Sequence, residues 1–162
     1  MNIPALDYLE VADRLPVHFE FGQLTSLFEA NINLFEDVVQ EDYFLYSRSL
    51  LEFIDTLCNV KCLKLDLSFR KGFLERADNL ETVIFYEYGC EEIEGWKEPP
   101  QQVPKCLLSR LKIIKIATIE GEKHEFEIIR YLIRNAKVLE TIELAHGSCI
   151  GFKKKFNMVY GM

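Results

Sequence analysis

The chain contains three histidines and five cysteines, the residue types most often used for nucleophilic catalysis and metal binding. His18, His124 and His146 are far apart along the chain, and none lies in a known nucleophile or metalloprotease motif. Cys58 and Cys62 have the spacing of half a zinc site, but no second Cys/His pair with matching spacing follows them. We therefore expect no catalytic, cofactor-binding or metal site, and we interpret these thiols as structural.

Two short segments near the C-terminus were tested as anion or nucleic-acid sites. Gly147-Ser148-x-x-Gly151 lacks the strand, glycine-rich turn, lysine and helix of a phosphate-binding loop. Lys153-Lys154-Lys155 is a basic run of three, whereas localisation and nucleic-acid signals usually contain five or more cations. We interpret this run as a solvated tail, and a localisation or nucleic-acid contact is the alternative.

Composition limits the class of protein. The 162 residues are 49% hydrophobic and 28% charged, which suits one compact domain or a short repeat array. The net charge of -7 argues against binding to duplex nucleic acid, which requires a basic face. No apolar stretch approaches the roughly 18 residues of a membrane span, and the N-terminus has no secretory pattern. We therefore expect an intracellular protein, nuclear or cytoplasmic, without membrane contact.

A phrase of the form apolar-x-x-apolar-x-apolar recurs along the chain. Its copies begin at Leu6, Leu24, Val60, Leu80, Leu111 and Leu139. The steps between successive starts are 18, 36, 20, 31 and 28 residues, and leucine-rich repeats typically run at about 20–29 residues. The copy at Leu24 is weaker because Glu29 occupies its third apolar position. In the alternative interpretation, the strand of this copy continues through Ala30 and Ile32.

This repeat predicts an α/β fold, a leucine-rich-repeat solenoid with parallel strands on one side and helices or loops on the other. The alternative is an ordinary α/β domain whose buried strands look alike. Alternation along each strand places one set of side chains inside: Leu63, Leu65, Val83, Phe85, Ile114, Ile116, Ile142 and Leu144. The outward middle row gives the protein-binding candidates: Glu10, Phe28, Lys64, Ile84, Lys115 and Glu143. Lys115 and Glu143 should sit side by side on neighbouring strands.

The segments between the repeats should cover the inner side of the sheet. Residues 122–137 predict a helix whose apolar stripe has helical spacing: Ile129, Leu132, Ile133 and Ala136. Residues 41–57 predict a second helix with the following residues buried: Tyr43, Leu50, Leu51, Ile54 and Leu57. The stretch 89–104 contains Gly95, Pro99, Pro100 and Pro104, and it predicts an extended loop packed against the array.

Trp96-Lys97-Glu98-Pro99-Pro100 and the run Val103-Pro104-x-Cys106-Leu107-Leu108-Ser109 resemble the FBD domain of plant F-box/leucine-rich-repeat proteins. The resemblance continues through Tyr131-Leu132-x-x-Asn135-Ala136-x-Val138-Leu139, while the upstream half resembles the repeat region of these proteins. It implies a leucine-rich-repeat region at 1–95, an FBD-like region at 96–146 and a divergent tail at 147–162. It also implies that Trp96 anchors its loop to the array, and Cys106 should pack as a small hydrophobic residue.

Family members open with an F-box that docks the adaptor of a cullin-RING ubiquitin ligase, and their repeats and FBD domain are thought to present the substrate. No F-box precedes the first strand here, so we expect no binding to the adaptor. The sequence therefore predicts a non-enzymatic protein-interaction module whose partner is a protein, by resemblance a ubiquitylation substrate. The alternatives are a truncated or vestigial family member without independent activity and, less favoured, a small α/β hydrolase or transferase.

Overall fold

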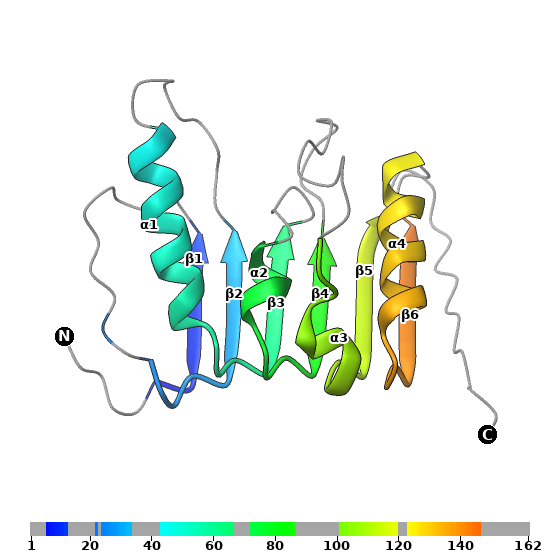
Figure 1. The fold of residues 1–162 in the computed structure, drawn as a ribbon, viewed down its shortest axis with the longest axis horizontal. Coiled ribbons are helices and arrows are strands. Elements are labelled where there is room, and N and C mark those ends of the chain that lie inside the picture. The colour runs from blue at the N-terminus through cyan, green and yellow to red at the C-terminus, as the bar shows by residue number, and fades with distance from the viewer. Residues whose placement is uncertain are drawn as a thin grey trace.

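The computed structural model describes residues 6–12, 22, 24–33, 43–66, 72–86, 101–119 and 123–146. Within these residues, six strands form one sheet and four helices accompany it (Figure 1). In chain order the elements are β1 (Tyr8–Ala12), β2 (Glu29–Asn33), α1 (Tyr43–Thr56), β3 (Cys62–Asp66), α2 (Gly72–Arg76), β4 (Thr82–Tyr86), α3 (Lys105–Ser109), β5 (Ile113–Ile119), α4 (Lys123–Asn135) and β6 (Thr141–His146).

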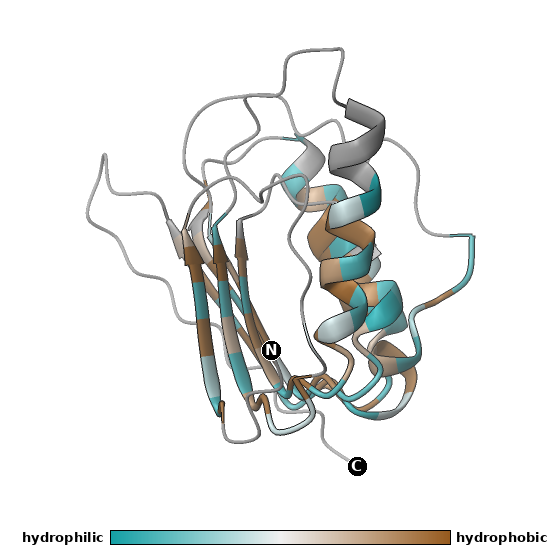
Figure 2. Ribbon diagram, turned by 90° about the vertical axis from the view of Figure 1, so that its left-hand side faces the viewer, coloured by the Kyte–Doolittle hydropathy of each residue, from teal (hydrophilic) through white to brown (hydrophobic). Residues whose placement is uncertain are grey.

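The sheet is parallel, and its strands lie in the order in which the chain makes them, from β1 to β6. The helices lie on one face of the sheet, so the described residues form two layers, as the side view in Figure 2 shows. The predicted α/β class and the parallel arrangement are confirmed. We call the helix-covered face of the sheet the inner face and the opposite face the outer face.

The recurring apolar phrase explains where the strands begin. Each strand starts two residues after an apolar residue that is itself packed in or against the core, such as Val60 before β3 and Leu80 before β4. The predicted inner row is confirmed in register: Leu63 pairs with Val83, Val83 with Ile114 and Ile114 with Ile142. These four side chains are at most 1% exposed.

The burial prediction was wrong in degree for Leu144, which is half-buried. Leu144 lies on β6, which has a strand neighbour on one side only among the described residues. Its equivalents Phe85 and Ile116 have strands on both sides and are 3% and 2% exposed. The difference follows from the principle that each repeat covers the next.

Five equivalent backbone contacts hold successive strands in register. The carbonyl of Lys61, just before β3, accepts hydrogen bonds from the N–H groups of Glu81 and Thr82 at 2.9 Å each. The same paired contact is made by the carbonyls of Asp7, Phe28, Glu81 and Lys112. A one-residue slip would turn the apolar set of a strand toward solvent, so this repeated contact and the apolar alternation specify the same register.

The two longer helices, α1 and α4, were predicted in the right places, but the buried stripe of each differs from the prediction. Leu50 and Ile54 in α1 and Leu57 just after it are buried as predicted. Leu51, by contrast, is 44% exposed, and Phe53 is fully buried instead. The observed stripe keeps the i, i+3, i+4, i+7 spacing that one helix face requires. The side chain of Tyr43 is outside the described residues.

In α4 the buried face is likewise shifted along the helix. Ile129, Leu132 and Ala136 are buried as predicted, but Ile133 is only half-buried. Ile128 and Glu125, at 1% exposure each, complete the buried face. Because Glu125 is a charged residue, the apolar pattern does not include it, and the predicted buried stripe therefore began only at Ile129.

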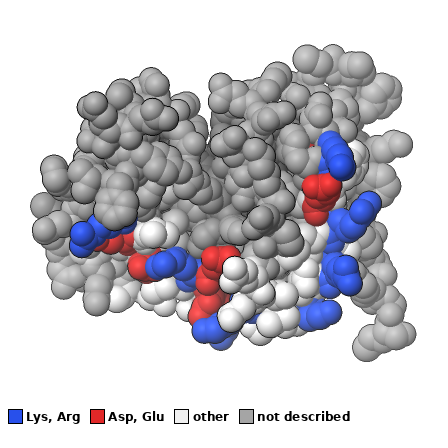
Figure 3. Space-filling view, turned by 45° about the horizontal axis from the view of Figure 1, so that its top comes forward, with Lys and Arg blue, Asp and Glu red and all other residues white. Residues whose placement is uncertain are grey.

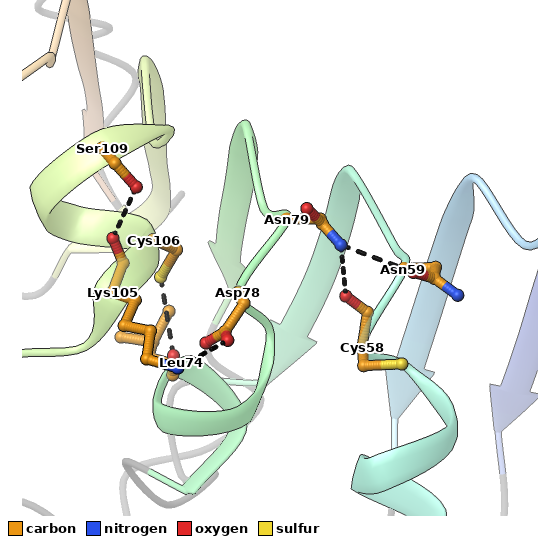
Figure 4. Close-up of polar contacts among 8 residues, drawn as sticks. All are labelled: Cys58, Asn59, Leu74, Asp78, Asn79, Lys105, Cys106 and Ser109. Atoms are coloured by element: carbon orange, nitrogen blue, oxygen red, sulfur yellow. Dashed lines mark hydrogen bonds and ion pairs between the residues drawn. The ribbon is translucent and has the colours of Figure 1, made fainter.

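Neighbouring helices and the turns that follow them contact one another at the edge of the sheet where the strands begin, at the bottom of Figure 1, and Figure 4 shows these contacts in close-up. Asn79 Nδ2 donates hydrogen bonds to the Cys58 carbonyl at 3.2 Å and to Asn59 Oδ1 at 3.4 Å. Lys105 Nζ lies 3.2 Å from Asp78 Oδ2, and the Cys106 thiol donates to the Leu74 carbonyl at 3.5 Å. Neighbouring repeats are thus joined through their turns as well as through the sheet.

Of the predicted loop at 89–104, residues 101–104 lie within the described ranges. Val103 packs against the core and Pro104 is buried before α3, which agrees with the predicted packing. Trp96 and the tail at 147–162 lie outside the described residues. Among the residues that the structure describes, no helix has the length and apolar character needed to cross a membrane.

Burial should make Cys106 unreactive in the native protein. Its side chain is fully buried, and this burial raises the pKa of the thiol from 9.0 to about 11. At pH 8 the thiolate fraction is therefore about a hundredfold lower than for an ordinary thiol. We expect an iodoacetamide pulse to modify the exposed Cys58 and to spare Cys106 until urea unfolds the chain, as read by peptide mass spectrometry. Equal labelling of both cysteines in the native protein would contradict this packing.

Candidate protein-interaction surface

The outer face of the sheet carries one continuous row of side chains in register. Strand pairing aligns the third residue of each of the six described strands: Glu10, Asn31, Lys64, Ile84, Lys115 and Glu143. We call this set the central row. Five of its members are the residues predicted from alternation, so their alignment in one row agrees with the prediction except at β2. Their role in protein binding stays a prediction.

The prediction was wrong for Phe28, which lies just before β2 rather than within the central row. The repeat begins at Leu27 and reads Leu27-x-x-Ala30-x-Ile32, three residues later than the copy predicted from Leu24. Ala30 and Ile32 are fully buried, which agrees with the alternative strand position. The offset was hard to detect because Ala30, a small residue, fills a position that larger apolar residues occupy in the other repeats.

Phe28 instead belongs to a second row along the edge of the sheet where the strands begin, at the position equivalent to Asp7 and Lys61. It is 54% exposed, and Lys61 Nζ lies 5.8 Å from the centroid of its ring, within the range of a cation–π contact. Lys61 Nζ is also 3.3 Å from Glu81 Oε1, and Lys112 Nζ is 3.4 Å from Glu140 Oε1. Charges on this edge are therefore satisfied between neighbouring repeats.

A chain of hydrogen bonds crosses the outer face from β1 to β4. The Tyr8 hydroxyl donates to Glu10 Oε2 at 3.2 Å, and Asn31 Nδ2 donates to Glu10 Oε1 at 3.3 Å. From β4, the Tyr86 hydroxyl lies 3.2 Å from Asn31 Oδ1 and 3.0 Å from the Ile32 carbonyl. Because β3 lies between β2 and β4, the Tyr86 side chain passes over the outer side of β3.

Two ion pairs flank the centre of the row. Lys64 Nζ is 3.5 Å from Glu29 Oε1, and Lys115 Nζ is 3.4 Å from Glu143 Oε2. The predicted adjacency of Lys115 and Glu143 on neighbouring strands is confirmed. Ile84 lies between Lys64 and Lys115 in the strand register, so an apolar side chain separates two cations.

The Lys115–Glu143 pair should contribute little to stability. Its side chains are 41% and 30% exposed, and solvent screening limits exposed pairs to about 0–1 kcal/mol. A double-mutant cycle with Lys115→Ala and Glu143→Ala, measured by urea denaturation, should give a coupling energy in that range. A coupling energy well above 1 kcal/mol would contradict this prediction and would show that the ion pair makes a large contribution to the stability of the fold.

Of the residues considered for chemistry in the sequence, the structure describes the free thiols of Cys58 and Cys62. Cys58 is exposed in the turn after α1, and Cys62 is half-buried at the start of β3, where burial and the neighbouring Glu29 carboxylate raise the pKa of its thiol. His18 and the side chains of His124 and His146 lie outside the described residues. In the part of the chain that is described, no group of three or more His, Cys, Asp or Glu residues could hold a metal ion.

The helix side of the molecule has a different character. Ion pairs lie along it, including Arg48 with Glu52 on α1 and Arg76 with Asp55 between helices. Figure 3 shows acidic and basic side chains next to one another over this side, with cations gathered over α4 at the right. The exposed cations of α4 and the turn that follows it are Lys123, Arg130, Arg134 and Lys137.

Comparison with known proteins supports the resemblance seen in the sequence. Residues 98–144 match the FBD family model, a segment that includes α3, β5 and α4. The chain is 26% identical to an F-box/FBD/LRR-repeat protein of Arabidopsis thaliana over 86% of its own length and 36% of that protein. It is 27% identical to a putative FBD-associated F-box protein of the same plant over 98% of its length and 41% of that protein.

The chain therefore spans about two fifths of the length of these relatives. No solved structure gives a significant match. The predicted boundary at residue 96 stays a prediction. The strands on either side of it, β4 and β5, are neighbours in one sheet. The predicted resemblance to the plant F-box/FBD/LRR proteins is confirmed, because residues 98–144 match the FBD family model and the chain is similar to F-box/FBD proteins of Arabidopsis thaliana over most of its length.

Proposed function

We propose that the chain is a segment of a leucine-rich-repeat solenoid and that the outer face of its sheet binds a protein partner. Three observations support the solenoid: the strands lie in chain order, the helices lie on one face, and the same backbone contact recurs at five junctions. Solenoids present extended faces for binding, because each repeat contributes equivalent positions to one continuous surface.

The observation that carries the binding role is the composition of the central row. It places charged, amide and apolar side chains at regular strand spacing, with Ile84 near its middle. A mixed surface of this kind suits a protein partner, whose polar and apolar groups are also interspersed. A small-molecule site would instead be concave and mostly apolar. For the same reasons we propose a binding role rather than an enzymatic one.

By resemblance to the family, the proposed partner is a substrate that an F-box protein presents for ubiquitylation. Family members dock the ligase adaptor through their F-box, so we do not assign adaptor binding to the outer face. Binding of a substrate there would leave the helix side and its ion pairs exposed.

The proposal is tested by affinity purification from Arabidopsis seedling extract with tagged wild-type chain and two matched variants. Ile84→Asp places a charge at the centre of the outer face, and Phe126→Asp places one on the exposed surface of α4, where Phe126 is 51% exposed. We expect proteins enriched with wild type to be lost with Ile84→Asp and retained with Phe126→Asp. Thermal melts of the variants control for unfolding. Identical enrichment with all three chains would contradict a binding role for the outer face.

A further inference from the structure

The charges around Ile84 are arranged symmetrically on the outer face. Lys64 and Lys115 are its direct neighbours on β3 and β5. Each lysine pairs with a carboxylate on the side away from Ile84, Lys64 with Glu29 on β2 and Lys115 with Glu143 on β6. The aliphatic stems of both lysines therefore lie next to Ile84, while their ammonium groups lean outward. A cation therefore lies on each side of the apolar centre. Beyond the cations, Glu143 follows in the central row on β6, whereas Glu29 lies two residues before the row position on β2.

Other side chains extend or bound this centre along the strands. Thr82 and Tyr86 lie two residues before and after Ile84 on the same face of β4. Ile113 pairs with Thr82 in register and adds a second apolar side chain. The Tyr86 hydroxyl is held at Asn31 and the Ile32 carbonyl, so its side chain borders the space above Lys64. The result is a small apolar patch with one fixed aromatic wall and a cation on each side.

We propose that this patch binds a protein segment that presents one apolar side chain with a carboxylate on each side of it. The inference deepens the proposed function and rests on it. The apolar side chain would cover Ile84, and the two carboxylates would reach Lys64 and Lys115. The backbones of these lysines are two strand spacings apart, about 10 Å, and their ammonium groups lean outward from there. In an extended segment, carboxylates two residues before and after the apolar residue lie on the same face as it, about 13 Å apart.

The existing ion pairs leave both lysines able to bind such a segment. Each ammonium group has three donors, and the lysine side chains remain 37% and 41% exposed. Exposed pairs of this kind contribute only about 0–1 kcal/mol, so a partner carboxylate can join or replace the internal one.

The test uses a displayed library of random 12-residue peptides selected on three forms of the full chain. The first is wild type, and the second is Ile84→Asp. The third exchanges the charges within both ion pairs by Lys64→Glu, Glu29→Lys, Lys115→Glu and Glu143→Lys, which keeps the pairs and reverses the pattern around Ile84. Thermal melts verify that all three are folded.

We expect wild type to enrich peptides in which acidic residues flank an apolar one, and the charge-exchanged chain to enrich peptides with basic residues there. A wild-type peptide should bind the charge-exchanged chain about tenfold more weakly or worse, since two favourable contacts become repulsive. Peptides that require Ile84 but are the same on both charge forms would overturn this inference and leave the proposed function standing. Peptides indifferent to Ile84→Asp as well would overturn both.

Discussion

Leu63→Ala is expected to lower the free energy of unfolding by about 2–5 kcal/mol, the cost of truncating a buried leucine. Leu63 is fully buried on β3 and is paired in register with Ala30 on β2 and Val83 on β4. Because single domains have a total stability of about 5–15 kcal/mol, the variant should show a large fall in melting temperature. Urea denaturation followed by circular dichroism gives the free-energy change directly.

Lys64→Ala is the matched control, because it removes a side chain at the adjacent position that points to the outer face. Lys64 is partly exposed and makes one surface ion pair, so its truncation should cost no more than about 1 kcal/mol. Equal losses for the two variants would contradict the assignment of inner and outer faces. The more severe Leu63→Asp should prevent folding, since it also buries a charge without a partner.

Phe53→Ala should have a comparably large effect, about 3–5 kcal/mol, because it empties the space of a fully buried aromatic side chain. Phe53 lies on α1 and belongs to the continuous core that joins the helices to the sheet. Loss of its contacts should loosen α1 from the sheet. Thermal and urea unfolding of the purified variant provide the measurement.

Leu51→Ala controls for the phase of α1. Leu51 is two residues away on the same helix and is 44% exposed, so truncation there should change stability by less than about 1 kcal/mol. The sequence pattern alone predicted Leu51 to be buried, and the structure predicts the opposite. A Leu51→Ala variant as unstable as Phe53→Ala would support the sequence-based prediction that Leu51 is buried, and it would contradict the packing described for α1.

The strands could be predicted from sequence because a strand of two-residue period leaves a short and regular apolar signature. Leu63 with Leu65 and Ile114 with Ile116 show this signature directly, and register then follows from aligning equivalent positions. The position of β2 was predicted wrongly for a physical reason. Ala30 occupies an inner position of this strand, and its small side chain adds too little hydrophobicity to show in the apolar pattern. The buried faces of α1 and α4 were predicted only in part, because both helices carry apolar residues on more than one face.

The short helices α2 and α3 could not be predicted from periodicity, because five residues contain little more than one turn. Their positions depend on tertiary contacts such as the bond between the Cys106 thiol and the Leu74 carbonyl. Part of the candidate interaction surface also depends on tertiary contacts and could not be predicted from the sequence. Tyr86 reaches Asn31 across 55 sequence positions and one intervening strand, a contact that depends on side-chain length and strand order rather than on any local pattern.

The central claim is that the outer face of the sheet, and not the helix side, contacts a protein partner. Site-specific photo-crosslinking tests it most directly, with benzoylphenylalanine placed singly at Ile84 and Ile113 on the outer face and at Leu51 and Phe126 on the helix side. After irradiation in Arabidopsis seedling extract, we predict discrete adducts of higher mass from positions 84 and 113, with the same partner identified by mass spectrometry. Adducts from positions 51 and 126 alone, or none from the outer face, would contradict the claim.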